Sequence, residues 1–379
     1  MTSIKSTKEP AALTDTGGAE AERARLESVA SLVLERARQL GASGCEVGAS
    51  VQTGLTATVR MREIDTVEYS RDRGVSITVY FGQHKGSAST ADLQRDSIET
   101  SIETACAIAR FTEADPCAGL ADPELMAEEI PDLDLWHPWD LDVDQAVERA
   151  MAMEAAGLEA HPLITNSEGA TVSAGHSVSV YANSHGFLGH RIGSRHFFSC
   201  SLLAEDADDK VRDYYFDVKR SRDDLLSPEA VGKEAAERAV ARHGAGSIAT
   251  CRVPVLFSSE MARGLFGHLL AAISGGNLYR GSSFLIDALG KPLFPDWLTI
   301  EEQPFEPRGL RSAAYDNEGV ATRERAIVDA GVLAGYVLSS YSARKLGMQT
   351  TGNAGGVHNL TVLPGQLSED ELIAQMGRG

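Results

Sequence analysis

The sequence predicts an α+β fold: two N-terminal helix-and-sheet units followed by a mostly β C-terminal domain that carries one long helix. Two observations lead to this prediction. Each of the first two units consists of a helical segment, several β-rich segments and a second helical segment. The chain is also long enough, at 379 residues with 43% hydrophobic composition, for two or three domains.

The first unit begins after a segment without periodicity. Residues 1–20 are rich in Ala, Thr, Gly and Lys, so we expect a mobile tail there. From Ala21 to Gly41, apolar residues recur at helical spacing. Three β-rich segments and a second helix follow, and we assign residues 21–118 to a first α+β domain that contains an antiparallel meander. These segments are CEVGASVQ, LTATVRMREIDTVEYS, GVSITVYFG and LQRDSIETSIETACAIARF.

An acidic connector with four prolines leads into the second unit, and we expect it to lie on the surface with Trp136 and Trp139 as anchors. An amphipathic helix, several strands broken by Gly and Asn turns, and a helix that starts at Ser227 predict a second α+β domain over residues 119–246. The spacing of four histidines in this unit matches no metal motif, so we predict no metal site there. They are His176, His185, His190 and His196.

The C-terminal domain, residues 247–379, opens with a short apolar segment, CRVPVLFS, that predicts a strand. The chain then continues into a helix predicted over residues 258–275. His268 lies on a stripe of this helix whose other members are small or apolar. The ordinary role of a histidine on such a stripe is a hydrogen-bonded core residue, and we favour that role over a metal ligand.

Glycine marks two further features of this domain. The segment AIVDAGVLAGYVLSS predicts a hairpin with Gly331 in its turn. The segment TTGNAGGVHN matches no phosphate-binding pattern, so we propose no nucleotide. We give equal weight to two roles for it, a lining of a substrate path or subunit interface and a structural turn. The residues concerned are Asn353, Gly355, Gly356 and His358.

Composition excludes several classes of protein. The net charge is −19 without a basic run, which argues against direct binding of nucleic acid. Neither a membrane-spanning apolar segment nor a secretory signal is recognisable, so we expect a cytoplasmic protein that does not bind membranes. The five cysteines lie far apart without a CxxC pair, which indicates reduced thiols.

Three segments of the C-terminal half resemble the TldD/PmbA family on its PmbA branch, which is also called TldE. They are GHLLAAISGGNLYRGSSFLIDALGKPLFPDW, SAAYDNEGVATRERAIV and GYVLSSYSARKLGMQTTGNAGGVHNL. The resemblance extends from about residue 25 to the end of the chain. It implies a subunit of a cytoplasmic TldD/TldE-type zinc metallopeptidase complex that degrades unfolded peptides and processes leader peptides. The family was formerly called a modulator of DNA gyrase.

In the TldD branch of this family, an HExxxH helix holds the catalytic zinc. Matching the glycine-histidine pairs places Arg263 at the first histidine, Gly264 at the glutamate and His268 at the second histidine. A protonated arginine has no lone pair for a metal, and glycine has no side chain to act as a base. Glu260 lies eight residues before His268 without a second histidine. The resemblance therefore implies no metal on this chain and zinc on a TldD-like partner.

We favour a non-catalytic subunit that forms a hetero-oligomer with a TldD-like chain and admits unfolded peptides to the zinc of that partner; self-association stays open. One alternative is a metallopeptidase active in its own right. A second alternative is a non-enzymatic regulator of gyrase or of a toxin system. Family members continue beyond the segment LTVLPGQLSEDELIAQMGRG, so we expect the C-terminal domain to be truncated here.

Overall fold

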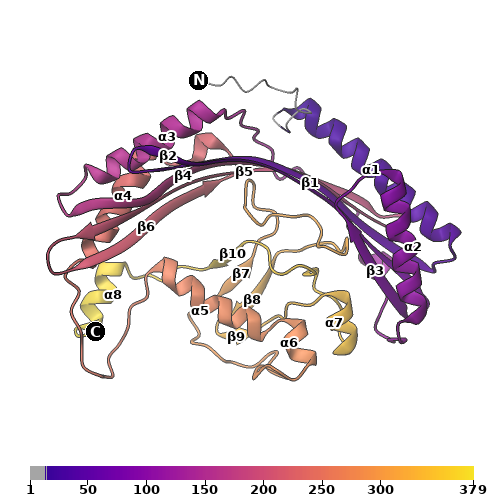
Figure 1. Ribbon diagram of the computed structural model, residues 1–379. Helices are drawn as coiled ribbons and strands as arrows, with labels where there is room; N and C mark the ends of the chain where they lie inside the picture. The colour runs from indigo at the N-terminus through magenta and orange to yellow at the C-terminus, as the bar shows by residue number, and fades with distance from the viewer. Residues whose placement is uncertain (1–12, 14) are drawn as a thin grey trace, which may run out of the picture. The chain divides into compact units, whose positions relative to one another are not determined.

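The computed structural model describes residue 13 and residues 15–379. Packing divides the chain into two units: unit 1 comprises Met1–Glu113 and Asp134–Ala245, and unit 2 comprises Ala114–Leu133 and Gly246–Gly379. Both units combine helices with antiparallel sheet, so the predicted α+β class is confirmed (Figure 1).

Unit 1 is built on one six-stranded antiparallel sheet with the order β3-β2-β1-β4-β5-β6. Because β1 pairs with β4 over most of its length, the two helix-and-sheet units expected from the sequence share a single sheet. This pairing removes two long unpaired edges that separate sheets would expose. The strands are β1 (Gly44–Arg60), β2 (Glu63–Phe81), β3 (His84–Thr90), β4 (Ile164–Asn183), β5 (Leu188–Glu205) and β6 (Lys210–Lys219).

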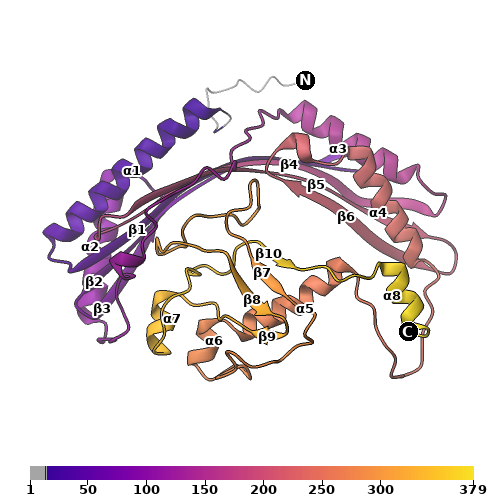
Figure 2. The ribbon, with the colours of Figure 1, turned by 180° about the vertical axis from the view of Figure 1, so that it is seen from behind.

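The four α-helices of unit 1 cover only the convex face of this sheet (Figures 1 and 2). They are α1 (Thr16–Gln39), α2 (Arg95–Phe111), α3 (Val143–Leu158) and α4 (Pro228–Arg242), and a short 3-10 turn, η2 (Arg222–Asp224), precedes α4. One apolar core lies under α1 and α2, and a second lies under α3 and α4. Trp139, expected to anchor the connector, is buried in the second core. The opposite face of the sheet carries no helix of this unit.

Helix α1 begins earlier than the sequence analysis predicted. The side chain of Asp15 caps it by accepting a hydrogen bond of 2.6 Å from the backbone N–H of Gly18. Residues 16–20 of the predicted tail are therefore helical. The rest of that predicted tail, except Leu13 and Asp15, lies outside the described residues.

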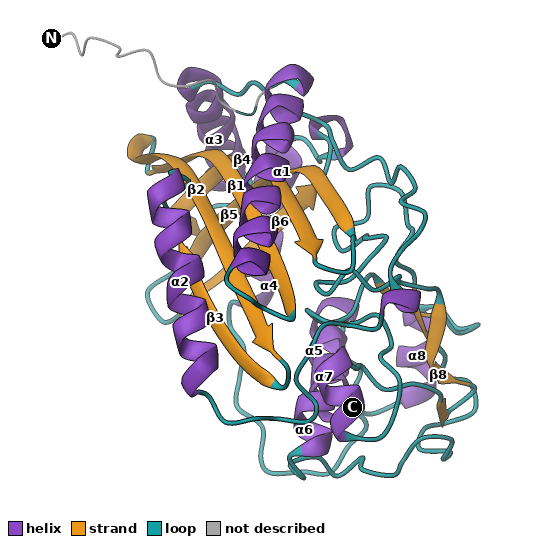
Figure 3. Cartoon of the chain, turned by 90° about the vertical axis from the view of Figure 1, so that its right-hand side faces the viewer, coloured by secondary structure: helices purple, strands orange, loops and turns teal. Residues whose placement is uncertain are grey.

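Unit 2 contains a small four-stranded antiparallel sheet with the order β10-β7-β8-β9. Its strands are β7 (Ile300–Glu302), β8 (Arg325–Asp329), β9 (Val332–Leu333) and β10 (Leu360–Val362). Its helices are η1 (Pro123–Leu125), α5 (Ser259–Ala272), α6 (Gly275–Tyr279), α7 (Ser340–Lys345) and α8 (Glu369–Met376). Long loops connect these elements (Figure 3).

Two local predictions for unit 2 had opposite outcomes. The hairpin is confirmed, since β8 pairs with β9 around a turn in which Gly331 has a φ of 80°. The strand expected from CRVPVLFS is wrong, because residues 251–257 form no strand in the structure. Val255 is 65% exposed and Phe257 48% exposed there, so the apolar run is not covered by a partner strand. None of the described helices is both long and apolar enough to cross a membrane.

Close approach of α3 and α4 depends on two glycines. A Cβ atom at Gly232 would overlap the carbonyl oxygen of Met153, and one at Gly157 would lie 2.5 Å from a methyl carbon of Leu202. The backbones of the two helices are therefore in direct contact. Any side chain at Gly232 must push the helices apart.

We expect Gly232→Ala to lower the free energy of unfolding by about 1–3 kcal/mol, because an added methyl group overpacks a rigid backbone contact. Gly264→Ala is the matched control, since Gly264 is also helical but no atom lies within 4 Å of its missing Cβ. Alanine should stabilise that helix by about 0.5–1 kcal/mol. Urea unfolding monitored by circular dichroism measures both changes, and equal effects of the same sign would contradict the contact.

Candidate functional site

The three positions matched to the HExxxH motif lie on the exposed side of α5. Both Arg263 and His268 are exposed, and the space beside Gly264 is open. The prediction that His268 is a hydrogen-bonded core residue is therefore wrong. The helix contacts the core of unit 2 through Phe266, Leu269, Leu270 and Ala272, which are partly buried, and not through His268.

These positions do not fit a catalytic zinc ion. Such a site needs three protein ligands, usually His, Asp, Glu or Cys, and an open position for water. Here His268 supplies one imidazole, Arg263 a permanent cation and Gly264 no side chain. Within residues 15–379 no group of three or more His, Cys, Asp or Glu side chains is arranged to hold a metal ion.

The second predicted feature, the segment 350–359, is organised around a buried carboxylate. Glu302 on β7 is 1% exposed and accepts three hydrogen bonds from this segment. The donors are the side-chain amide of Asn353 at 2.7 Å, the backbone N–H of His358 at 2.8 Å and its Nδ1 at 3.0 Å. Asn353 and His358 are thus brought together by a residue that the sequence analysis did not select.

Arg325 on β8 completes this network. Its Nε donates to Glu302 at 2.8 Å, and its guanidinium also donates to the Asn353 side-chain oxygen and the Tyr336 carbonyl, each at 2.8 Å. Burial of Glu302 opposes its ionisation, but the hydrogen bonds from His358 and the charge of Arg325 outweigh this effect and lower its pKa. Glu302 is therefore held as a carboxylate at neutral pH.

A second buried carboxylate, Asp316, supports the middle of the same segment. It accepts a hydrogen bond of 2.8 Å from the backbone N–H of Ala354. Burial of Asp316 raises its pKa to about 6, although hydrogen bonds from the backbone N–H groups of Ala354, Glu318 and Val320 act in the opposite direction. Gly355 and Gly356 follow with φ values of 97° and 106°, and a Cβ at Gly355 would overlap the side chain of Asn317. Only glycine fits this bend without strain.

The segment therefore has a buried part and an accessible part. Asn353 is 4% exposed and His358 is 9% exposed, whereas Gly355 is exposed between them. The contacts of Asn353 and His358 with Glu302 are those expected of a structural turn. The exposed glycine backbone is the part that could contact a ligand or another chain.

The α5 helix and this segment are connected through residues 336–338. The backbone N–H of Val337 donates at 3.1 Å to the carbonyl of Ile273, the C-cap of α5, and the Val337 carbonyl accepts at 2.8 Å from Gly275, the first residue of α6. On the other side, the backbone N–H of Leu338 donates to the Thr351 hydroxyl at 2.8 Å. The two predicted features thus belong to one hydrogen-bonded framework within unit 2.

Models of three domains described as PmbA/TldA metallopeptidase domain 1, central domain and C-terminal domain match residues 45–109, 136–242 and 250–379. The chain belongs to this family. The resemblance inferred from the sequence is thereby confirmed.

Two relatives within the PmbA/TldA family are closely similar in sequence. The "Metalloprotease PmbA" of Escherichia coli O157:H7 is 44% identical over 360 residues, which cover 95% of this chain and 80% of that protein. The "Metalloprotease PmbA homolog" of Haemophilus influenzae is also 44% identical, with the same coverage of both chains. These similarities place the chain among relatives named as metalloproteases.

Two solved structures share the fold. A candidate modulator of DNA gyrase from Bacteroides thetaiotaomicron superposes with a TM-score of 0.86 at 25% identity, covering 92% of this chain and 80% of that one. TldE from Thermococcus kodakarensis gives a TM-score of 0.79 at 20% identity, covering 94% and 81%. At 20% identity the second similarity concerns the fold alone.

Proposed function

We propose that this chain is the non-catalytic subunit of a cytoplasmic TldD/TldE-type metallopeptidase complex. Membership of a metallopeptidase family supports the peptidase context. The observation that carries the proposal is the composition of α5, where Arg263 and Gly264 occupy the positions that we match to a metal ligand and a general base. A TldD-like partner would then supply the zinc and activate the attacking water.

The substrates proposed are unfolded peptides, including leader peptides. An extended peptide can be held without sequence preference through its main chain, which suits a degradative complex. We assign the backbone at the exposed Gly355 and the half-buried Gly356 to the substrate path or to the interface with the partner. The buried contacts of Asn353 and His358 support this assignment, because they hold the two glycines in one conformation.

The test uses three samples: this chain, a TldD-like partner, and an equimolar mixture. Zinc content is measured by atomic absorption, peptidase activity with an unfolded protein substrate, and assembly by size-exclusion chromatography. We expect a complex, bound zinc and full activity in the mixture, with no stoichiometric zinc on this chain. Failure to form a complex would refute the subunit role.

The alternative is a metallopeptidase active in its own right. The names of the two relatives favour it, since both are called metalloproteases. Stoichiometric zinc together with activity in the isolated chain would establish this alternative. Peptide turnover that does not change when this chain is deleted would instead favour a non-enzymatic regulator.

A further inference from the structure

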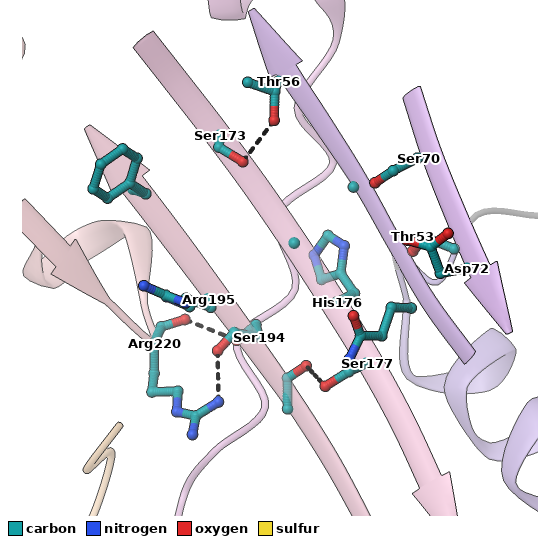
Figure 4. Close-up of a pocket in the computed structure, with 15 residues that line it drawn as sticks. Thr53, Thr56, Ser70, Asp72, Ser173, His176, Ser177, Ser194, Arg195 and Arg220 are labelled. Atoms are coloured by element: carbon teal, nitrogen blue, oxygen red, sulfur yellow. Dashed lines mark hydrogen bonds between the residues drawn. The ribbon is translucent and has the colours of Figure 1, made fainter. Parts of the chain in front are cut away.

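The helix-free face of the sheet in unit 1 contains a pocket of about 490 Å³. It spans β2, β1, β4 and β5, and Figure 4 shows the residues that line it. On β4, Ser173, Gly175 and Ser177 face this pocket, and the largely buried His176 also contributes to its lining, while Ala174 and Val178 are buried beneath the helices. The pocket is therefore a property of the polar face of the sheet.

Three glycines form the floor of the pocket. Gly54 on β1 pairs directly with Gly175 on β4, and Gly193 on β5 lies opposite Ser177. A Cβ at Gly193 would lie 3.1 Å from Nη1 of Arg220, so this glycine leaves room for the guanidinium. The floor of the pocket thus consists largely of backbone, which allows a ligand to approach the sheet closely.

Two arginines stand at one end of the pocket, and an acid stands at the other. Arg195 is exposed on β5, and Arg220 follows β6 with Nη1 donating to the Ser194 carbonyl at 3.0 Å. Burial and then the positive charge of Arg195 lower the pKa of Arg220, which indicates that the two cations repel each other. Asp72 lines the opposite side (Figure 4). An anion bound beside Arg195 would therefore lie close to a second cation, Arg220.

An aromatic row continues from this end along the same face of the sheet. Phe197 lines the pocket two residues from Arg195, and its ring centroid lies 5.9 Å from that of Phe216 on β6. Tyr214 stacks on Phe216 at 6.2 Å and is 49% exposed. A ligand group beside the arginines would therefore meet an apolar, aromatic surface.

We propose that this pocket binds the C-terminal carboxylate of a short extended peptide whose last side chain is large and apolar. The guanidinium groups of Arg195 and Arg220 receive the carboxylate, and Phe197 receives the side chain. Identification of the ligand as a peptide rests on the proposed function. Charge complementarity selects the carboxylate, because the chain as a whole has a net charge of −19 and repels anions elsewhere.

The dimensions of the pocket limit the length of the peptide. Adjacent strands lie about 4.8 Å apart, so the distance from β2 to β5 is roughly 14 Å. An extended chain advances about 3.3–3.6 Å per residue, so about four residues span this distance. The amino group of a tetrapeptide then lies on the side of Asp72, which carries the opposite charge.

Isothermal titration calorimetry with the full chain tests this site. The ligands are the tetrapeptide Ala-Ala-Ala-Phe with a free carboxylate, the same peptide amidated at its C-terminus, and inorganic phosphate. We expect the free acid to bind and amidation to weaken binding at least about tenfold, because a charge-assisted pair is lost. Equal binding of acid and amide, no binding of either, or phosphate binding as tight as the acid would overturn the proposal.

Variants locate the site. Arg195→Gln should weaken binding of the free acid about tenfold. Arg212→Gln is the matched control, because Arg212 lies on the same face, on β6, but outside the pocket, and is 64% exposed in its pair with Glu168. Equal loss in both variants would overturn the assignment. The comparison of acid with amide needs no variant and so does not depend on how a variant folds.

The result is separable from the test of the proposed function. Assembly with a TldD-like partner and activity of the mixture concern the complex, whereas calorimetry concerns this chain alone. Activity of the mixture without carboxylate binding would remove the pocket proposal and leave the subunit role intact. Carboxylate binding without assembly would support the pocket proposal and remove the subunit role.

Discussion

Replacing Glu302 with alanine is expected to lower the free energy of unfolding of unit 2 by about 3–5 kcal/mol. The carboxylate is 1% exposed and pairs with Arg325, whose side chain is 13% exposed. Removing the carboxylate takes away the acceptor for the buried guanidinium of Arg325. The side chains of Asn353 and His358 then also lose the acceptor for one hydrogen bond each. The cost is large because buried donors that lose their acceptor are costly.

Guanidinium-induced unfolding of the full chain provides the measurement, with two companion variants. Glu301→Ala removes the neighbouring carboxylate of the same strand, which is only partly buried and contacts Gln303, so a change within about 0.5 kcal/mol is expected. Glu302→Gln retains one acceptor oxygen and should give an intermediate loss. Similar small losses for Glu301→Ala and Glu302→Ala would show that the network contributes little.

The same substitution has a consequence for the glycine segment. Asn353 and His358 hold its two ends on Glu302, so without the carboxylate the backbone at Gly355 and Gly356 is held less firmly. Hydrogen exchange over residues 350–359 should then accelerate more than exchange in the sheet of unit 1. In the proposed complex, this loosening would reduce peptide turnover even at temperatures where the chain remains folded.

Hydrophobic periodicity predicted correctly the helices that have a single apolar face. It did not predict which side of a helix is buried when the helix has two apolar faces. On α5, the stripe through His268 satisfies helical spacing, but Phe266, Leu269 and Leu270 form a second apolar face, roughly 120° around the helix. The second face is the one that packs against the core. His268 is therefore exposed, and sequence spacing by itself did not distinguish the two faces.

The pairing of distant strands was the second feature that the sequence did not predict. The pairing of β1 with β4 joins segments more than a hundred residues apart, and each segment alone indicates only an alternating strand. The turn between β1 and β2 was also missed, because Met61 and Arg62 adopt positive φ values of 50° and 64° without a glycine or asparagine to mark them. A carboxylate of Glu154 accepts the backbone N–H of both residues, at 2.8 and 2.7 Å.

The candidate site shows the same limit at the level of single residues. Asn353 and His358 were selected because they stand in a glycine-rich segment, and the structure places both on Glu302. Glu302 itself stands next to Glu301 in a short strand, where alternation makes one carboxylate buried and the other half-exposed. Nothing local in the sequence shows which of the two is the buried one, because the partner Arg325 comes from another strand.

Acidification is expected to destabilise unit 1 through a buried histidine. His176 on β4 is 6% exposed, and its Nε2 accepts a hydrogen bond of 3.0 Å from the backbone N–H of Trp139. The ring must therefore be neutral, with the proton on Nδ1. Burial, and then the proximity of His196 at a centroid distance of 5.7 Å, lower the pKa of His176 to about 4.

The direction of the pH effect follows from the two protonation states. In the unfolded chain a histidine binds a proton near pH 6.5, whereas folded His176 resists protonation until about pH 4. The stabilisation is therefore complete above pH 6.5 and is lost as the pH falls toward 4. The loss from His176 amounts to at most about 3 kcal/mol.

His176→Gln isolates this contribution. A glutamine side chain can still accept the Trp139 N–H but does not titrate, so unfolding of unit 1 should depend less steeply on pH between 6.5 and 4. Tryptophan fluorescence reports on this region, since the indole of Trp136 contacts His176 with a centroid distance of 5.6 Å. His185→Gln is the control, because His185 is exposed in the turn between β4 and β5 and its loss should leave the slope unchanged. If both variants kept the wild-type pH dependence, the acid sensitivity would have to arise from other groups of unit 1, such as His196, whose pKa is also lowered by burial, and not from the neutral ring of His176.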